Sequence, residues 1–329
     1  MKIVVTGGAG FLGQLLIRAL LERGRLARAD GSTGEIEQIV AVDQAQPGKL
    51  IVDDRVGYVV GDIGAPNFLS HVLAADTDSV FHLAAVVSGA AEADFDLGMR
   101  VNLDGTRALL DACRVQQCTP RVVFASSVAV FGGPLPAVVT DDTTPTPQSS
   151  YGVQKLVGEL LVGDYSRKGF VDGRAVRLPT VVVRPGRPNA AASSFASGII
   201  REPLAGETAI CPVEPETAMW LLSPGAAIRN LIHAHELPAD AWGSRRALNL
   251  PGLTLTVREM IEALRAVGGD AAVDRIRWQP DERVRAIVRT WPARFDTRRA
   301  DAMGFVRDAD FVEVVHDYAR TYGAGASPA

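Results

Sequence analysis

Short apolar runs alternate with longer amphipathic stretches over the first half of the chain. β-branched or other apolar residues dominate at 2–6, 38–42, 56–60, 79–83, 121–125 and 174–183, and helical patterns occupy most of the intervals between them. After the first run, for example, Phe11, Leu12, Leu15, Leu16 and Leu20 recur with the spacing of one helix face. Strands that alternate with helices predict an α/β fold, a doubly wound parallel sheet with helices on both faces.

The pattern changes after residue 184. Pro and Gly interrupt the second half often, with helices predicted near 193–205, 225–236, 256–267 and 309–321 and short strands at 208–212 and 246–250. We therefore predict a sheet-based domain over residues 1–184 and mainly a smaller C-terminal α/β lobe over residues 185–322. The last segment, 323–329, reads GAGASPA and is predicted to fray.

Composition narrows the class of partner. The 329 residues are 47% hydrophobic and 22% charged, with a formal net charge of −4, which is typical of an ordinary globular protein. Such a chain offers no basic stripe for phosphate backbones, so we expect a small-molecule partner and no nucleic acid. No apolar run reaches the roughly 18 residues that a membrane span needs, and the first residues resemble a strand more than a signal peptide. We expect a cytoplasmic location without membrane contact.

Residues that form disulfides or bind metals are sparse. Cys113, Cys118 and Cys211 are too few and too irregularly spaced for a disulfide framework, so we expect them to be reduced. His233 and His235 stand two positions apart and cannot share a helix face, so we predict no metal site.

A glycine cluster lies between the first predicted strand and the first predicted helix. Gly7 permits a tight turn, Gly10 lets the backbone approach a pyrophosphate, and Gly13 lets helix and strand pack closely. The phosphates would lie at the helix N-terminus, at Phe11 and Leu12, where free N–H groups and the helix dipole favour an anion. This context predicts a Rossmann-type dinucleotide site.

Residues at the ends of the next predicted strands are expected to contact other parts of the dinucleotide. Asp43 ends the second run, where a carboxylate hydrogen-bonds the adenosine ribose and repels a 2′-phosphate, so we predict NAD and not NADP. The interval before Asp43 is unusually long because the polar segment RLARADGSTGEIE lies within it, and an Asp that only caps a turn is the alternative. Carboxyl ends of parallel strands line the ligand crevice, so we expect further cofactor contacts from Asp62, Ile63, Leu83, Ala84 and Ala85.

Two polar pairs indicate catalysis. Tyr151 and Lys155 stand four residues apart in SYGVQKLVGELL, a helical pattern, so both side chains project from one helix face. Ser126 and Ser127 follow the fifth run, at the sheet edge where ligands bind in open α/β folds. An ammonium and a positively charged nicotinamide would both favour a tyrosinate, and a serine hydroxyl could hold the reacting oxygen. A Tyr-x-x-x-Lys pair by itself also occurs on plain surface helices.

Four motifs together carry a family resemblance. T-G-G-x-G-F-L-G, the strand end H-L-A-A, S-S-x-A-V-F-G and Y-x-x-x-K resemble the extended short-chain dehydrogenase/reductases over nearly the whole chain. The resemblance implies that Tyr151 is the general acid/base, that Lys155 holds the nicotinamide ribose and lowers the tyrosine pKa, and that Ser127 is the active-site serine, with Ser126 as the alternative. Asn102 matches an asparagine behind the active site and is counted with the cofactor residues. Helix pairing into a homodimer is common in this family.

Departures from the pattern narrow the expected chemistry. Val128-Ala129 replace the acidic pair of sugar 4,6-dehydratases, and L-P-T-V-V-V-R-P-G lacks the asparagine that sugar-nucleotide epimerases use to bind hexose. The segments RLPTVVVRPGRPNAAASSFASGIIREPLAGE, W-L-L-S-P-G and L-N-L-P-G-L-T-x-T-V instead resemble the D-erythronate dehydrogenases. That resemblance implies NAD-dependent oxidation of the C2 hydroxyl of D-erythronate, a four-carbon sugar acid, to 2-dehydro-D-erythronate. The alternatives are a nucleotide-sugar epimerase with tightly held NAD and a non-catalytic NAD-sensing module.

A sugar acid is an anion, and its carboxylate needs a cation or several donors. Arg184 directly follows the sixth run and is the preferred cation, with Arg187 as the alternative and Asn189, Ser193 and Ser194 as neutral donors. A surface ion pair is the competing interpretation of either arginine. We further expect the cofactor to contact Pro179 and the substrate to contact Ser88, Ser126, Ser127, Tyr151 and Thr180. Residues 1–184 are therefore predicted to form the NAD-binding Rossmann domain, and residues 185–322 a lobe that mainly binds the substrate.

Overall fold

The computed structural model describes residues 1–186 and 191–323. They fold into two compact units, each built from segments far apart in the sequence. The first comprises residues 1–130, 149–177 and 228–248, and the second comprises 131–148, 178–227 and the chain from 249 onward. The predicted functional division after residue 184 stays a prediction, and the predicted frayed tail lies outside the described residues except for Gly323.

A seven-stranded sheet forms the centre of the first unit, in the order β5-β4-β1-β6-β7-β8-β12. Its strands are β1 (Lys2–Thr6), β4 (Gln38–Asp43), β5 (Val56–Val60), β6 (Thr77–His82), β7 (Arg121–Ser127), β8 (Asp172–Leu178) and β12 (Ala247–Asn249). The pairs β5·β4, β4·β1, β1·β6 and β6·β7 are parallel. This arrangement confirms the predicted Rossmann-type α/β fold.

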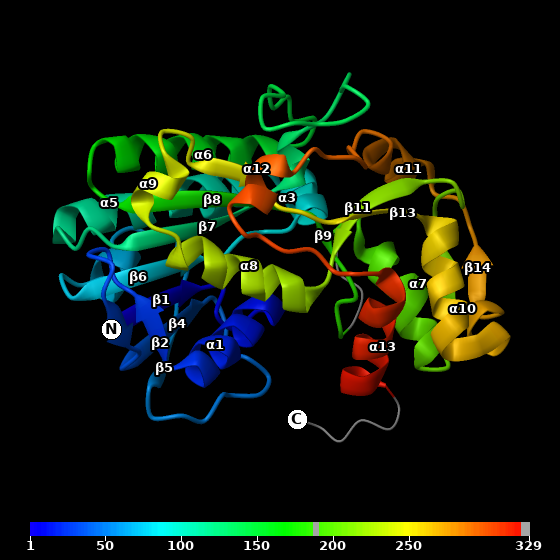
Figure 1. Ribbon diagram of the computed structural model, residues 1–329, viewed down its shortest axis with the longest axis horizontal. Helices are drawn as coiled ribbons and strands as arrows, with labels where there is room; N and C mark the ends of the chain where they lie inside the picture. The colour runs from blue at the N-terminus through cyan, green and yellow to red at the C-terminus, as the bar shows by residue number, and fades with distance from the viewer. Residues whose placement is uncertain (187–190, 324–329) are drawn as a thin grey trace. The chain divides into compact units, whose positions relative to one another are not determined.

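Helices cover both faces of this sheet (Figure 1). On one face lie α1 (Phe11–Arg23) and residues 228–236 of α8 (Pro224–Glu236), where His235 stacks on Phe81 of β6 with ring centroids 5.4 Å apart. On the other face, α2 (Phe68–Val72), α5 (Gly105–Gln116) and α6 (Ser150–Arg167) share an apolar core with Val4, Val80 and Val122. Successive strand residues point to opposite faces, and helices cover both, which is why Ile3–Val5 in β1 and Val122–Phe124 in β7 are apolar at every position.

Shorter elements complete the first unit. They are the hairpin of β2 (Arg25–Ala27) and β3 (Thr33–Glu35), α3 (Ser88–Ala93), α4 (Phe95–Gly98), the π-helical turn Met99–Asp104, the 3-10 turn Val128–Val130 and α9 (Ala239–Trp242). The hairpin accounts for the polar segment that lengthens the interval before Asp43.

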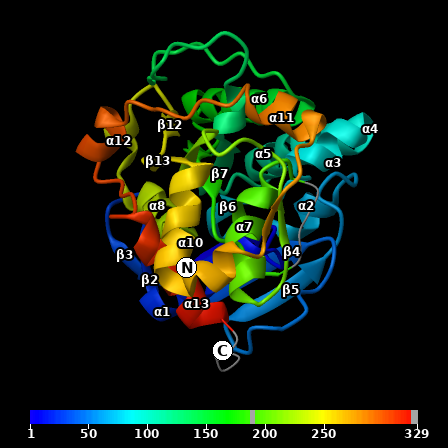
Figure 2. The same cartoon turned by 90° about the vertical axis from the view of Figure 1, so that its right-hand side faces the viewer.

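The second unit contains two small sheets and a group of helices. β9 (Thr180–Val181), β11 (Ala218–Leu222) and β13 (Leu253–Thr256) form one sheet, and β10 (Ala209–Cys211) pairs in parallel with β14 (Ile276–Trp278). α7 (Ser194–Leu204) and α13 (Phe311–Tyr322) both pack on α10 (Val257–Val273) around an apolar core (Figure 2). α11 (Glu282–Val288) and α12 (Arg298–Ala302) follow later in the chain. This unit is also α/β, as predicted for the C-terminal lobe.

Two predicted strands differ in the structure, because one is divided and the other joins a different sheet from the one expected. The run 174–183 is not one strand, because β8 ends at Leu178 and β9 begins at Thr180 in a different sheet. Pro179 lies between them, and a residue without an N–H cannot continue the hydrogen-bonded ladder. The strand predicted at 246–250 for the C-terminal lobe joins the seven-stranded sheet as β12. There the Ala175 N–H donates to the Arg246 carbonyl at 2.7 Å.

Candidate active site

The glycine turn between β1 and α1 packs tightly on one side and is exposed on the other. Gly7 has φ +72°, and a Cβ there would lie 2.8 Å from the backbone nitrogen of Ala84. A Cβ on Gly13 would collide with the Gly7 carbonyl oxygen. Gly10 is exposed at the start of α1. The turn therefore presents bare backbone where the helix begins.

The first turn of α1 offers hydrogen-bond donors at this end. Phe11 and Leu12 open the helix, and N–H groups in a first turn have no acceptor within the helix. Asp43, at the end of β4, lies beside the turn: its Oδ2 accepts from the Ala9 N–H at 3.0 Å and its Oδ1 from the Gln44 N–H at 2.8 Å. Donors for a pyrophosphate and a carboxylate for a ribose thus lie together, so these residues fit a dinucleotide.

Asp62 and Ile63 follow β5 and have different surroundings. The Asp62 carboxylate forms an ion pair with Arg100 of the π-helical turn and accepts from the Gly64 N–H at 2.8 Å. The Ile63 side chain is buried in the apolar core, where a Cβ on Gly105 would meet it. Of these two residues, Asp62 is therefore the one that presents a polar side chain to a ligand.

Buried polar side chains hold the segment that follows β6. His82 Nδ1 lies 2.6 Å from Thr6 Oγ1, and its Nε2 lies 3.0 Å from Thr106 Oγ1. Burial, with Lys155 nearby, lowers the pKa of His82 to about 3, so the imidazole is neutral. Asn102, buried in the π-helical turn, accepts from the Val86 N–H at 2.7 Å and donates to the Val86 carbonyl at 3.0 Å. Asn102 thus fixes the backbone after Leu83, Ala84 and Ala85, all of which are half-buried.

α6 brings Tyr151 and Lys155 to the end of β7. The Ser149 hydroxyl caps the helix by accepting from the Gly152 N–H at 3.2 Å, which places Tyr151 in the first turn. Lys155 is 2% exposed, and its ammonium group donates to the Ala125 carbonyl at 2.8 Å and lies 5.7 Å from the centre of the Tyr151 ring. A buried cation therefore lies next to a half-buried phenol at the edge of the sheet.

The two serines at the end of β7 differ in their partners. Ser126 is buried, and its hydroxyl donates to Glu159 at 2.5 Å. Ser127 is half-buried, and its oxygen accepts from the Ala129 N–H at 3.1 Å. The Ser127 hydroxyl hydrogen stays available for a substrate oxygen in this arrangement, whereas that of Ser126 is committed to a carboxylate.

Glu159 is a buried charge that the sequence interpretation missed. Its carboxylate binds the Arg177 guanidinium in two places, at 2.9 Å to Nε and 2.7 Å to Nη2. Burial lowers the pKa of Lys155 to about 8, and the negative charge of Glu159 opposes this shift. Glu159 stands four residues after Lys155 on the same helix face, and that spacing was the available signal.

The remaining predicted substrate residues lie in several places. Arg184 follows β9, where its N–H donates to Ser197 Oγ at 3.1 Å and its Nη2 to Ser193 Oγ at 3.4 Å. Ser194 begins α7, Pro179 is buried, and Thr180 is half-buried in β9. Ser88 begins α3 in the first unit. Asn189 and Arg187 lie outside the described residues.

Comparison with known proteins establishes the family. The pattern of the NAD dependent epimerase/dehydratase family matches residues 3–239. The chain belongs to this family. It is 58% identical to D-erythronate dehydrogenase from Cupriavidus necator, covering 98% of this chain and 99% of the relative, and 45% identical to D-erythronate dehydrogenase from Haemophilus influenzae, covering 97% and 98%. Among solved structures, a nucleoside-diphosphate-sugar epimerase from Agrobacterium tumefaciens is 43% identical with a TM-score of 0.92, covering 99% and 95%.

These relationships define the class of enzyme. The protein is an NAD-dependent dehydrogenase of the epimerase/dehydratase family, with a small molecule as substrate. In the described parts of the chain, no helix is long and apolar enough to cross a membrane. The same residues contain no group of three His, Cys, Asp or Glu side chains that could hold a metal ion.

Proposed function

We propose that this dehydrogenase oxidises the C2 hydroxyl of D-erythronate to a ketone, giving 2-dehydro-D-erythronate. The observation that carries the proposal is the buried Lys155 ammonium beside Tyr151 at the end of β7, in a chain 58% identical over nearly its full length to a D-erythronate dehydrogenase. The same constellation argues against a sensing module, because binding alone needs no such group of residues.

Tyr151, Lys155 and Ser127 share the proton transfer. An ammonium beside a phenol favours the ionised form, so Tyr151 acts as the base that takes the proton of the C2 hydroxyl. Ser127 holds the reacting oxygen through its hydroxyl hydrogen. When bound, NAD supplies the hydride acceptor at its nicotinamide ring. Ser126, committed to Glu159, supports the end of the strand.

Binding of the two ligands draws on the other predicted residues. The turn at Gly7, Gly10 and Gly13 and the N-terminus of α1 would hold the pyrophosphate, and Asp43 the adenosine ribose. Asp62, Ile63, Leu83, Ala84, Ala85, Asn102 and Pro179 would complete the surroundings of the cofactor. Arg184, with its guanidinium beside Ser193, would bind the substrate carboxylate, and Ser88, Thr180 and Asn189 would contact its hydroxyl groups.

A nucleotide-sugar epimerase is the second candidate, because the Agrobacterium tumefaciens structure carries that name. The two functions differ in what happens to the electrons. An epimerase returns the hydride to its substrate in each cycle, whereas a dehydrogenase releases NADH.

The deciding experiment follows NADH absorbance with NAD and D-erythronate, with UDP-glucose as the comparison substrate. We expect NADH to accumulate only with D-erythronate, and Tyr151→Phe to abolish this while NADH still binds, since only the proton acceptor is lost. Epimerisation of UDP-glucose without net NADH formation would support the second candidate. A Tyr151→Phe variant within tenfold of the unmodified activity would rule out Tyr151 as the base.

A further inference from the structure

Cys113 and Cys118 meet at the C-terminal end of α5. The helix ends at Gln116, and Gln117 has a left-handed backbone with φ +53°, which turns the chain back over the helix. The Gln117 N–H donates to the Arg114 carbonyl at 3.3 Å. In this type of helix end, the residue four positions before the left-handed residue contacts the residue after it. Cysteines occupy both of these positions.

The two cysteines lie against each other. The Cys118 S–H donates to the Cys113 backbone carbonyl oxygen at 3.7 Å, and hydrogen bonding between the two side chains is the main influence on the pKa of each thiol. Cys113 is fully buried in the core beneath α5, whereas Cys118 is half-buried. Cys211, the third cysteine, is buried in the second unit.

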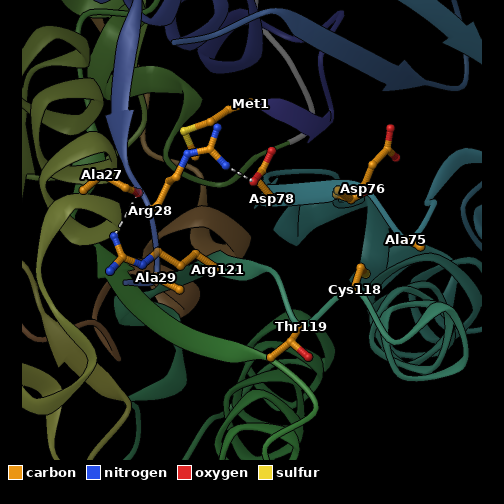
Figure 3. Close-up of a pocket in the computed structure, with 11 residues that line it drawn as sticks. Met1, Ala27, Arg28, Ala29, Ala75, Asp76, Asp78, Cys118, Thr119 and Arg121 are labelled. Carbon is orange, nitrogen blue, oxygen red and sulfur yellow. Dashed lines mark hydrogen bonds and ion pairs between the residues drawn. The ribbon is translucent and has the colours of Figure 1, made fainter. Parts of the chain in front are cut away.

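Cys118 also lines a cavity of about 190 Å³ in the first unit (Figure 3). The walls are polar: Arg28 pairs with Asp78 at 3.2 Å, and Arg121 donates to the Ala27 carbonyl at 3.1 Å. Thr77 and Arg121, which begin β6 and β7, also line it. The cavity therefore lies at the edge where these strands start, opposite the edge that carries Ser127. A cavity of this size and polarity admits small polar molecules.

The hydrogen bond between the thiols makes them chemically unequal. It lowers the pKa of Cys118 and raises the pKa of Cys113. A thiolate, and not a thiol, is the form that attacks an oxidant. Cys118 is therefore the residue suited to react first, and Cys113 keeps its proton beside it.

We propose that Cys118 is a redox modification site, which hydrogen peroxide oxidises and which Cys113 converts to a disulfide. The Cys118 sulfur attacks one peroxide oxygen, the O–O bond breaks, and a sulfenic acid forms with release of hydroxide, which takes up a proton to become water. The Cys113 sulfur then attacks the Cys118 sulfur, an S–S bond forms, and the sulfenic oxygen leaves as water. Two thiols lose two electrons, and the peroxide is reduced to two waters.

This pairing would protect the protein chemically. A lone sulfenic acid is exposed to further oxidation to a sulfinic acid, which thiols do not reverse. A neighbouring thiol diverts it to a disulfide that thiols reduce again. The proposal does not depend on which substrate the dehydrogenase oxidises.

Trypsin provides a direct readout, because Arg114 lies between the two cysteines. Cleavage of the reduced protein separates peptide 108–114 from peptide 115–121. The full protein is treated with hydrogen peroxide, then unfolded in denaturant and alkylated with iodoacetamide so that buried thiols also react, and it is finally digested and analysed by mass spectrometry. We expect the two peptides to be joined until a reductant is added. Cys118 should lose reactivity at least about tenfold faster than Cys211, whose pKa burial raises to about 11.

Matched variants assign the two roles. Cys118→Ser should abolish the joined peptides and leave Cys113 alkylated, whereas Cys211→Ser should leave the joined peptides unchanged. In Cys113→Ala, Cys118 should be oxidised beyond the sulfenic acid to sulfinic acid, because no neighbouring thiol forms the disulfide. The proposal is overturned if the unmodified protein accumulates sulfinic acid at Cys118 without joined peptides, or if Cys118 reacts no faster than Cys211.

Discussion

At the scale of single residues, Asp43 shows how one carboxylate would set the choice of cofactor. It accepts hydrogen bonds from the backbone of the glycine turn and of Gln44, which fixes a negative charge beside the proposed ribose site. A 2′-phosphate placed there would meet uncompensated repulsion. The hairpin that precedes β4 adds residues to the interval and leaves this placement intact.

Replacing Asp43 tests that choice. Asp43→Ala should reduce the preference of kcat/KM for NAD over NADP by about tenfold or more, since one repulsive contact is removed. Asp54→Ala, which removes an exposed carboxylate of the same unit, should leave the preference unchanged. Equal kcat/KM for both cofactors in the unmodified protein would contradict the role of Asp43.

Lys155 carries its positive charge in the interior of the protein, where burial disfavours the charged form. Its pKa is about 8 in the folded protein against an ordinary value of 10.5, because burial outweighs Glu159. Between these two pH values Lys155 holds its proton more firmly in the unfolded chain than in the folded chain, so this residue contributes a rise in the free energy of unfolding with pH across this window. The whole difference in pKa corresponds to a contribution of about 3 kcal/mol.

Denaturant titrations of the unmodified protein and of its lysine variants, at pH values spanning that window, isolate this contribution. Lys155→Met should make the slope of the free energy of unfolding against pH less positive, because the titrating group is gone, and Lys168→Met, an exposed lysine of the same region, should leave the slope unchanged. A Lys155→Met variant that keeps the full slope would show that another group is responsible.

At the scale of elements, the Glu159–Arg177 ion pair joins α6 to β8. Glu159 is 6% exposed and Arg177 7%, and the carboxylate also receives the Ser126 hydroxyl of β7. Three elements thus converge on one charge. Hydrophobic periodicity predicts the helix and both strands, but it carries no information on which polar groups meet beneath them.

Removing this carboxylate should be costly. Glu159→Ala leaves the buried Arg177 guanidinium without its carboxylate, and we expect a loss of about 3–5 kcal/mol in the free energy of unfolding. Asp164→Ala breaks a pair with Arg167 on the exposed side of the same helix and should cost less than about 1 kcal/mol. Similar losses for the two variants, measured by urea denaturation, would contradict a structural role for Glu159.

Strand boundaries were harder to predict than strand existence. The apolar run 174–183 looks continuous because both of its halves are buried, yet Pro179 divides it between two sheets. β12 is only three residues long, and its place beside β8 depends on backbone pairing between segments about seventy residues apart. Local pattern cannot specify a partner at that separation.

At the scale of the whole molecule, each compact unit is built from three segments that are separated in the sequence. Residues 228–248 belong to the first unit and 131–148 to the second, so a single cut along the sequence does not describe the compact units. The glycine turn, the strand ends and the Tyr-Lys spacing were readable because each is local in sequence. The surroundings of Arg184 were less readable, because Ser197 and Arg201 reach its backbone from α7.

The proposed role of Arg184 in binding the substrate carboxylate leads to a test with two readouts. Arg184→Ala should raise KM for D-erythronate by at least about tenfold, the contribution of one charge-assisted contact, and should leave the Kd for NADH unchanged. Arg187→Ala, the alternative cation, should change neither value. If KM is unchanged in Arg184→Ala but raised in Arg187→Ala, Arg187 and not Arg184 binds the substrate carboxylate.

The close approach of Gly7 to Ala84 restricts how this protein can diverge. A Cβ at position 7 would meet the backbone of residues 83 and 84, so no exchange of a neighbouring side chain can make room for it. Gly61 is different, because the three atoms nearest to a Cβ there all belong to the ring of Phe68, which would be absent if a smaller residue replaced Phe68. We expect second-site substitutions to restore the stability of Gly61→Ala but not that of Gly7→Ala. During evolution, position 61 can therefore accept other residues, whereas position 7 must remain glycine.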